Sequence, residues 1–160
     1  MTRYDLGIDE DLCWGCKTCE VACKTENGAP YGIKLIAVGE ERPALPDGSL
    51  SFVFRLSRCR HCEVPDCMEA CNFDAIEQRR DGIVVLDQAV CGGCEACVTA
   101  CLYRAITFDR AERVAMKCNL CHHRIDQGLL PACADNVCQA HCIRLVGAAA
   151  SPEGEIHDRV

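Results

Sequence analysis

The chain has few of the large apolar side chains that build an ordinary protein core. Only 5% of its 160 residues are aromatic, and the apolar fraction of 49% is inflated by 17 cysteines. A core of this kind is too thin to offset the conformational entropy lost when a loop-rich polypeptide becomes ordered. We therefore expect disulfides or metal centres to stabilise the fold.

Four other absences exclude classes of function. No apolar run is long enough to cross a bilayer, so we expect no direct membrane insertion. The segment before Cys13 has neither the basic start nor the apolar stretch of a signal peptide, so we expect a cytoplasmic protein. The net charge of −7 leaves no basic face for phosphates, which excludes a nucleic-acid partner. No nucleophile with a base, phosphate loop or pterin site is present, so we expect no catalysis by this chain alone.

The cysteines fall into four groups with short spacings. The first and third groups read C-x-x-C-x-x-C-x-x-x-C, and the second differs only by a longer central gap. Thiolates at this spacing converge on one cubane, while the last cysteine reaches another. Neither disulfides nor zinc sites require a third cysteine two residues after a C-x-x-C pair. The expected ligands of four 4Fe-4S clusters are Cys13, Cys16, Cys19 and Cys23; Cys59, Cys62, Cys67 and Cys71; Cys91, Cys94, Cys97 and Cys101; and Cys118, Cys121, Cys133 and Cys138.

The last cysteine of each group is expected to ligate a different cluster from the first three. The second and third groups exchange Cys71 and Cys101, which makes a complete two-cluster ferredoxin of residues 59–101. The first and fourth groups then exchange Cys23 and Cys138. The chain would thereby close on itself.

The fourth group is irregular and leaves alternatives open. The segments Cys71-Asn-Phe-Asp-Ala-Ile, Cys101-Leu-Tyr-Arg-Ala-Ile and Cys138-Gln-Ala-His-Cys-Ile align, which puts Cys142 at an alanine position. This alignment favours Cys138 as the last ligand and leaves Cys142 unused. The rival set uses Cys138 and Cys142 and leaves Cys133 unused, and zinc at this group is a third alternative.

The segment between the first and second groups has no cysteine and predicts a hairpin. Residues 34–38 and 51–56 have the alternation of strands, and residues 45–49 between them have turn chemistry. A turn at Asp81-Gly82 with a strand after it, and a strand around residues 4–8, are also expected. Within the first cysteine loop, Gly15 should let backbone amides approach a cluster sulfur.

Four motifs carry a resemblance to a known family: CWGCKTCEVACKTENGAP, RLSRCRHCEVPDCMEAC, CGGCEACVTACLYRAI and KCNLCHHRIDQGLLPAC. With them the chain resembles the four-cluster iron-sulfur subunits of molybdenum and tungsten oxidoreductases. That family includes subunits of dimethyl sulfoxide reductase, polysulfide reductase, formate dehydrogenase and tungsten aldehyde oxidoreductases. The resemblance implies an α+β fold of two ferredoxin-like modules, each with two 4Fe-4S clusters, related by a pseudo-twofold axis. Here no proline follows the last cysteine of a group, and the gap from Cys133 to Cys138 is one residue longer than usual.

The resemblance also implies an organisation and a function. We expect residues 1–147 to form one compact unit, with module A from residues 1–26 and 110–147, module B from residues 58–109, and a hairpin insert at 27–57. Residues 148–160 should form a flexible tail. The implied function is that of a non-catalytic wire between a large pterin-containing subunit of aldehyde or formate oxidoreductase type and a second electron partner. That second partner is a flavin subunit, a ferredoxin or further copies of the chain. The alternative is a stand-alone polyferredoxin or a redox-sensing iron-sulfur protein.

Overall fold

Short strands and short helices alternate with long loops in the computed structural model, which describes residues 3–49 and 51–147. The expected tail at residues 148–160 lies outside this range. Within it, none of the helices has the length and apolarity that crossing a membrane requires. The elements are β1 (Asp5–Ile8), the 3-10 helix η1 (Glu10–Leu12), α1 (Thr18–Glu26), β2 (Ile36–Glu41), β3 (Val53–Arg58), α2 (Asp66–Glu69), β4 (Ile76–Gln78), β5 (Val84–Leu86), α3 (Ala96–Ala100), β6 (Ile106–Asp109), β7 (Val114–Lys117), α4 (His122–Ile125) and β8 (Ile143–Val146).

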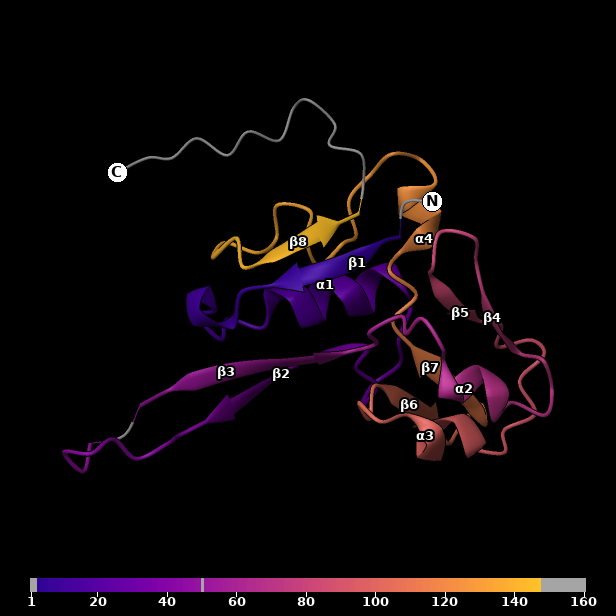
Figure 1. Cartoon of the computed structure of the whole chain (residues 1–160), viewed down its shortest axis with the longest axis horizontal. Coiled ribbons are helices and arrows are strands. Elements are labelled where there is room, and N and C mark those ends of the chain that lie inside the picture. Colours follow the sequence, from indigo (N-terminus) through magenta and orange to yellow (C-terminus); the bar gives the residue numbers. More distant parts are fainter. Residues whose placement is uncertain (1–2, 50, 148–160) are drawn as a thin grey trace.

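The strands pair two by two, and every pair is antiparallel. β2 pairs with β3, β4 with β5, and β6 with β7, each as neighbours along the chain. β1 pairs instead with β8, which sets Leu6 opposite Leu145 and joins segments from opposite ends of the described chain. Figure 1 shows β1 and β8 side by side above α1, while the β2–β3 hairpin extends away from the other elements. Backbone hydrogen bonds between β1 and β8 therefore join the two ends of the described chain.

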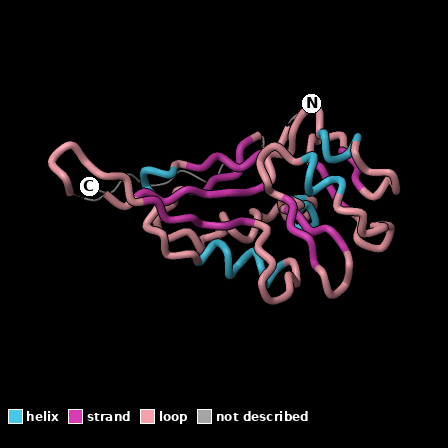
Figure 2. The backbone as a smooth tube through the Cα atoms, turned by 90° about the horizontal axis from the view of Figure 1, so that it is seen from below, coloured by secondary structure: helices cyan, strands magenta, loops and turns pink. Residues whose placement is uncertain are grey.

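The predicted hairpin between the first two cysteine groups is present, but its strands are displaced. They were expected at residues 34–38 and 51–56, and the structure has them at Ile36–Glu41 and Val53–Arg58. Gly39, Glu40 and Glu41 lack the expected apolar alternation, yet they pair with Arg55, Phe54 and Val53. Backbone pairing extends the ladder beyond the apolar pattern, because every residue in an antiparallel pair can contribute its amide and carbonyl. Seen from below, the hairpin forms a narrow arm at one side of the molecule (Figure 2).

The predicted turn before the strand of the second module is also present. Asp81 and Gly82 lie in a turn, with Gly82 at a φ of 82°, and β5 begins two residues later. Only glycine enters this left-handed region freely, which is why an Asp-Gly pair is a strong turn signal.

Cysteines form a large part of the buried core. One cluster of buried side chains joins Leu6, Ile36 and Ile143 to five cysteines, and a second joins Ile76, Val84 and Ile106 to Cys97. Aliphatic side chains from the paired strands thus cover the inner faces of the cysteine loops. The core is built around the thiols, as expected for a chain with so few aromatic residues.

Candidate metal centres

One end of the molecule holds four cysteines around a cavity, here called the Cys91 site. Cys91, Cys94 and Cys97 come from one loop and from α3, and Cys71 comes from the segment after α2. Most of the cavity's other lining residues are apolar or small, including Phe73, Ala75, Ile76, Leu86 and Ala115, and Glu95 is the charged one. The structure thus brings the last cysteine of the second group to the first three cysteines of the third.

A similar cavity, here called the Cys13 site, lies at another part of the molecule. Cys13, Cys16 and Cys19 line it together with Cys138 and Cys142. Trp14, Val38, Leu56 and Ile143 complete most of the wall. The fourth-group cysteines reach this cavity because β8, which begins directly after Cys142, is paired with β1.

The Cys59 site is an inner group made of Cys59, Cys62, Cys67 and Cys101. The pKa of Cys67 is raised to about 11, first by burial and then by the neighbouring thiolates of Cys59 and Cys101, while the charge of Lys117 opposes the rise. Burial and Cys59 likewise raise the pKa of Cys62. Cys101 also packs against the buried cluster that contains Cys59.

The Cys118 site is the second inner group, made of Cys118, Cys121, Cys133 and Cys23. Burial raises the pKa of Cys23 to about 12, and the nearby thiolates of Cys118 and Cys121 add to the rise. Burial also raises the pKa of Cys133, followed by the effect of Cys118 and Cys23. All four thiols are buried, so this site is the most enclosed of the four.

The four sites suit a group larger than one metal ion. Among residues 3–49 and 51–147, no three His, Cys, Asp or Glu side chains lie close enough together to hold a single ion. At the Cys91 and Cys13 sites the cysteines instead line a cavity together with mainly apolar side chains. Buried thiolates are costly without positive charge nearby, and iron bound between them supplies that charge. Four thiolates around a small apolar cavity fit a 4Fe-4S cluster.

A left-handed residue recurs two positions after the first cysteine of each group. Gly15, His61, Gly93 and Leu120 have φ values of 68°, 45°, 70° and 54°. This conformation turns the backbone amide toward the preceding thiol. The amide of Gly15 lies 3.5 Å from Sγ of Cys13, and those of His61 and Leu120 lie 3.4 Å from Sγ of Cys59 and Cys118. The expected approach of the Gly15 amide is confirmed, but sequence reasoning missed His61 and Leu120, whose only signal is their place in the loop.

The segments that follow the last cysteine of the second, third and fourth groups share one backbone conformation. Asp74, Arg104 and His141, each three residues after such a cysteine, have φ values of 51°, 49° and 49°. A buried residue follows each of them, namely Ala75, Ala105 and Cys142, and β4, β6 and β8 then begin at isoleucine. Cys138 therefore has the same position in the backbone as Cys71 and Cys101.

Cys142 lies close to Cys138 and lines the same cavity. The two Sγ atoms are 3.4 Å apart, and only 2% of Cys142 is exposed. The alignment of the three exits placed it at an alanine position, packed against the helix rather than aimed at a cluster, whereas the structure has it in the wall of the cavity. The alignment did not predict that a seventeenth thiol would lie beside the Cys13 site.

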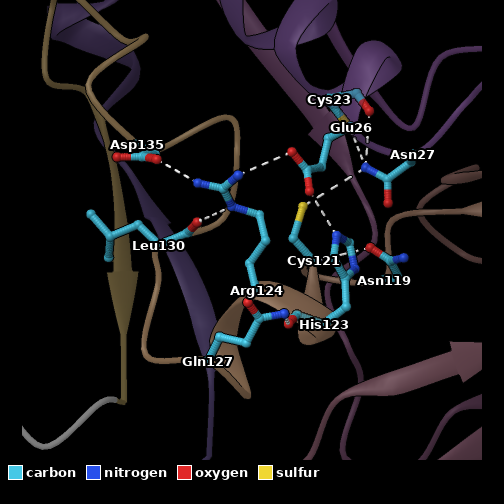
Figure 3. A network of polar contacts seen from close by, with 10 residues as sticks. All are labelled: Cys23, Glu26, Asn27, Asn119, Cys121, His123, Arg124, Gln127, Leu130 and Asp135. Carbon is cyan, nitrogen blue, oxygen red and sulfur yellow. Dashed lines mark hydrogen bonds and ion pairs between the residues drawn. The ribbon is translucent and has the colours of Figure 1, made fainter.

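A polar network attaches the irregular fourth group to α1 (Figure 3). The Arg124 guanidinium lies 3.0 Å from the Glu26 carboxylate, pairs with Asp135, and donates to the Leu130 carbonyl at 2.7 Å. The amide nitrogen of Asn27, next to Glu26, lies 3.7 Å from Sγ of Cys121. The long gap between Cys121 and Cys133 is thus folded over α4 and held against the end of α1.

The two cavity sites differ from the inner sites in exposure. Cys16 of the Cys13 site and Cys94 of the Cys91 site are exposed, whereas the described inner sites contain only buried or half-buried cysteines. Trp14, next to Cys16, is 66% exposed. The cavity sites are therefore the ones that another molecule can approach closely.

The grouped thiols, their shared backbone frame and the exchange of segments between them define an iron-sulfur protein of ferredoxin type. Comparison with protein families agrees with this class. Residues 50–148 match the model of the 4Fe-4S dicluster domain, and residues 6–26 match that of the 4Fe-4S binding domain. The protein belongs to the 4Fe-4S dicluster domain family, and the predicted cofactors, 4Fe-4S clusters, are confirmed.

Several subunits of reductases are similar to the chain. It is 37% identical over 160 residues to a tetrathionate reductase subunit of Salmonella typhimurium, a match that covers 96% of this chain and 61% of that protein. A component of the polysulfide reductase of Wolinella succinogenes is 35% identical, with 97% and 81% covered. A component of the anaerobic dimethyl sulfoxide reductase of Escherichia coli is 32% identical, with 84% and 69% covered. The chain thus spans less than two thirds of the first of these relatives and more of the other two.

Proposed function

We propose that the chain is an electron-transfer subunit that carries four 4Fe-4S clusters as a wire. The observation that carries the proposal is the pair of cavities, each lined by three cysteines of one loop and by a fourth from a distant part of the chain. A bound cluster supplies one-electron chemistry, and the chain holds it, shields it from water and sets its reduction potential. The proposed ligand sets are Cys13, Cys16, Cys19 and Cys138; Cys118, Cys121, Cys133 and Cys23; Cys59, Cys62, Cys67 and Cys101; and Cys91, Cys94, Cys97 and Cys71.

The proposed order of the clusters follows the elements that join the sites. α1 carries Cys19 of the Cys13 site and Cys23 of the Cys118 site. Cys118 and Cys59 pack in one buried group, which links the two inner sites. α3 carries Cys97 of the Cys91 site and ends at Cys101 of the Cys59 site. The order is therefore Cys13 site, Cys118 site, Cys59 site and Cys91 site.

The same connections between sites, through α1, α3 and the contact of Cys59 with Cys118, support two modules related by a pseudo-twofold axis. The Cys13 and Cys118 sites would form module A, and the Cys59 and Cys91 sites module B. β1 pairs with β8 beside module A, and the β4–β5 and β6–β7 pairs lie beside module B. We place the second boundary after β7 rather than at residue 110, because β7 pairs with β6. The β2–β3 hairpin joins the two modules.

We propose that electrons enter and leave at the two sites with exposed cysteines. The relatives are named as parts of reductases, so one end would face a large pterin-containing catalytic subunit and this chain would catalyse no reaction itself. Their names concern tetrathionate, polysulfide and dimethyl sulfoxide, which favours a reductase over the aldehyde or formate type expected from the sequence. The other end would face a flavin subunit, a ferredoxin or another copy.

The test is to purify the protein without oxygen from its native host and to analyse its metals and its companions. We expect about 16 irons and a similar amount of acid-labile sulfide per chain, with magnetically interacting 4Fe-4S signals on reduction. We also expect a pterin-containing protein to co-purify. About 12 irons with bound zinc would overturn the assignment of the Cys118 site, and a fully loaded chain that purifies alone would favour a stand-alone polyferredoxin.

A further inference from the structure

The side chain of Lys117 ends inside the protein, between the two inner sites. Only 5% of this residue is exposed, although lysine is almost never buried without a partner. Its Nζ atom lies 3.8 Å from Sγ of Cys59 and donates to the Cys118 carbonyl at 3.0 Å. A further hydrogen bond goes to the Val84 carbonyl. The ammonium thus contacts the first cysteine of each inner site.

No carboxylate neutralises this ammonium among the residues that the structure describes. Their ion pairs, counted to 4.0 Å, include none with Lys117. Arg58 makes an informative comparison, because it also precedes a cysteine, is 3% exposed and donates to the carbonyl of Cys59 at 2.7 Å. Arg58, however, has a carboxylate partner, Asp5, at 2.9 Å. The acidic group nearest to the Lys117 ammonium is therefore the Cys59 thiol.

A buried, unpaired ammonium is expensive, and carbonyl oxygens offset only part of its cost. The remaining stabilisation of the ammonium must come from negative charge in the protein interior. A 4Fe-4S cluster held by four thiolates carries such charge, and Cys59 brings one of those thiolates to the ammonium. The buried position of Lys117 thus fits a charged cluster at the Cys59 site.

We propose that Lys117 raises the reduction potential of the cluster held at the Cys59 site. This inference rests on the proposed function. Reduction adds one electron, and hence one negative charge, without making or breaking a bond; in the test below, dithionite supplies that electron. A fixed positive charge in a poorly solvated interior stabilises the reduced form more than the oxidised form, and a hydrogen bond to a ligand sulfur acts in the same direction.

The position of Lys117 also indicates which of the four clusters has its reduction potential raised most. The ammonium touches a carbonyl of the Cys118 site but a sulfur of the Cys59 site, so the Cys59 site should feel the larger effect. Cys59 and Cys118 form the buried contact between the two inner sites. Lys117 therefore favours the state in which the electron is on the cluster of the Cys59 site, in module B, over the state in which it is on the cluster of the Cys118 site, in module A.

The test compares two charge-removing variants in redox titrations followed by electron paramagnetic resonance. Lys117→Met removes the buried ammonium, whereas Lys34→Met removes an ammonium that is 52% exposed and paired with Glu20 at 2.6 Å. Both change the net charge by one unit. We expect Lys117→Met to reduce the equilibrium constant for reduction of one cluster about tenfold, a fall of about 59 mV for one electron. Lys34→Met should leave the midpoint of the cluster at the Cys59 site unchanged, because solvent screens an exposed charge that lies outside that site.

A Lys117→Met protein with about 16 irons and wild-type midpoints would overturn the inference, and so would an equal shift in Lys34→Met. If the methionine variant does not assemble, the wild type labelled with ζ-15N lysine gives a second measurement. Pulsed resonance of the reduced protein should detect a 15N coupling at one cluster, and its absence would be decisive against Lys117. A wild type with fewer clusters, or one that passes no electrons, would instead count against the proposed function.

Discussion

A methyl group at Gly15 should weaken the contact between the first cysteine loop and the β2–β3 hairpin. The φ of Gly15 is 68°, and the left-handed region costs alanine about 1–2 kcal/mol. The new Cβ would lie 2.6 Å from Cδ1 of Phe54 and closer to two other ring atoms. Relief of such overpacking costs about 1–3 kcal/mol. Gly15→Ala should therefore destabilise the folded protein by about 2–5 kcal/mol.

The rate of cluster loss is the suitable assay, because iron-sulfur proteins unfold irreversibly once iron is released. The visible absorbance is followed after addition of an iron chelator at mild denaturant concentration. Each 1.4 kcal/mol by which the substitution lowers the activation free energy of the rate-limiting opening makes the absorbance decay about tenfold faster. We expect at least this acceleration for Gly15→Ala.

Gly48→Ala is the matched control. Gly48 has a φ of 83° in the hairpin turn, and nothing lies within 4 Å of an added Cβ, so only the backbone cost applies. Replacing Phe54 by leucine in the Gly15→Ala background should recover part of the loss. Equal decay rates for the Gly15→Ala and Gly48→Ala proteins would refute the reasoning, since the Phe54 contact would then carry no energy.

Three further outcomes are expected. Cys138→Ser should lose at least one iron of about 16, whereas Cys142→Ser should lose none; iron analysis with electron paramagnetic resonance decides, and the reverse pattern would assign the ligand to Cys142. Arg124→Met should destabilise the fold and speed cluster loss, because Asp135 loses its cationic partner and Glu26 keeps only His123, while Arg42→Met at an exposed ion pair should change the rate less than about twofold. Removal of iron under reducing conditions should make the amides of β1 and β8 exchange faster than they do in the iron-loaded protein; unchanged protection would show that the clusters do not support the β1–β8 pair.

The chemistry of the sites was readable from the sequence because it is local. Three cysteines within seven residues can reach one cluster whatever the rest of the chain does. The same is true of the Gly15 amide, which lies two residues from Cys13. The hairpin was also predictable as an element, but its strand ends were not. Its ends depend on backbone pairing between Gly39 and Arg55, which apolar alternation does not report.

Other features of the sites follow from packing and were not predicted. His61 and Leu120 adopt the left-handed conformation that the other loops give to glycine, because the loop geometry overrides residue preference. The sequence placed Cys142 at an alanine position, but only the β1–β8 pair brings its thiol beside Cys138. The fourth loop is likewise held by Arg124, whose partner Glu26 is distant in sequence.

By itself, then, the sequence determined the kind of cofactor, the grouping of the cysteines and the presence of a hairpin. These depend on residue type and on spacing over a few residues, where the covalent chain limits the distances. Tertiary structure alone decided that β1 pairs with β8, that the Cys142 thiol lies beside Cys138, and that Lys117 is buried beside Cys59. Those outcomes depend on which surfaces pack together, and contacts between residues far apart in the chain are not encoded in any local pattern.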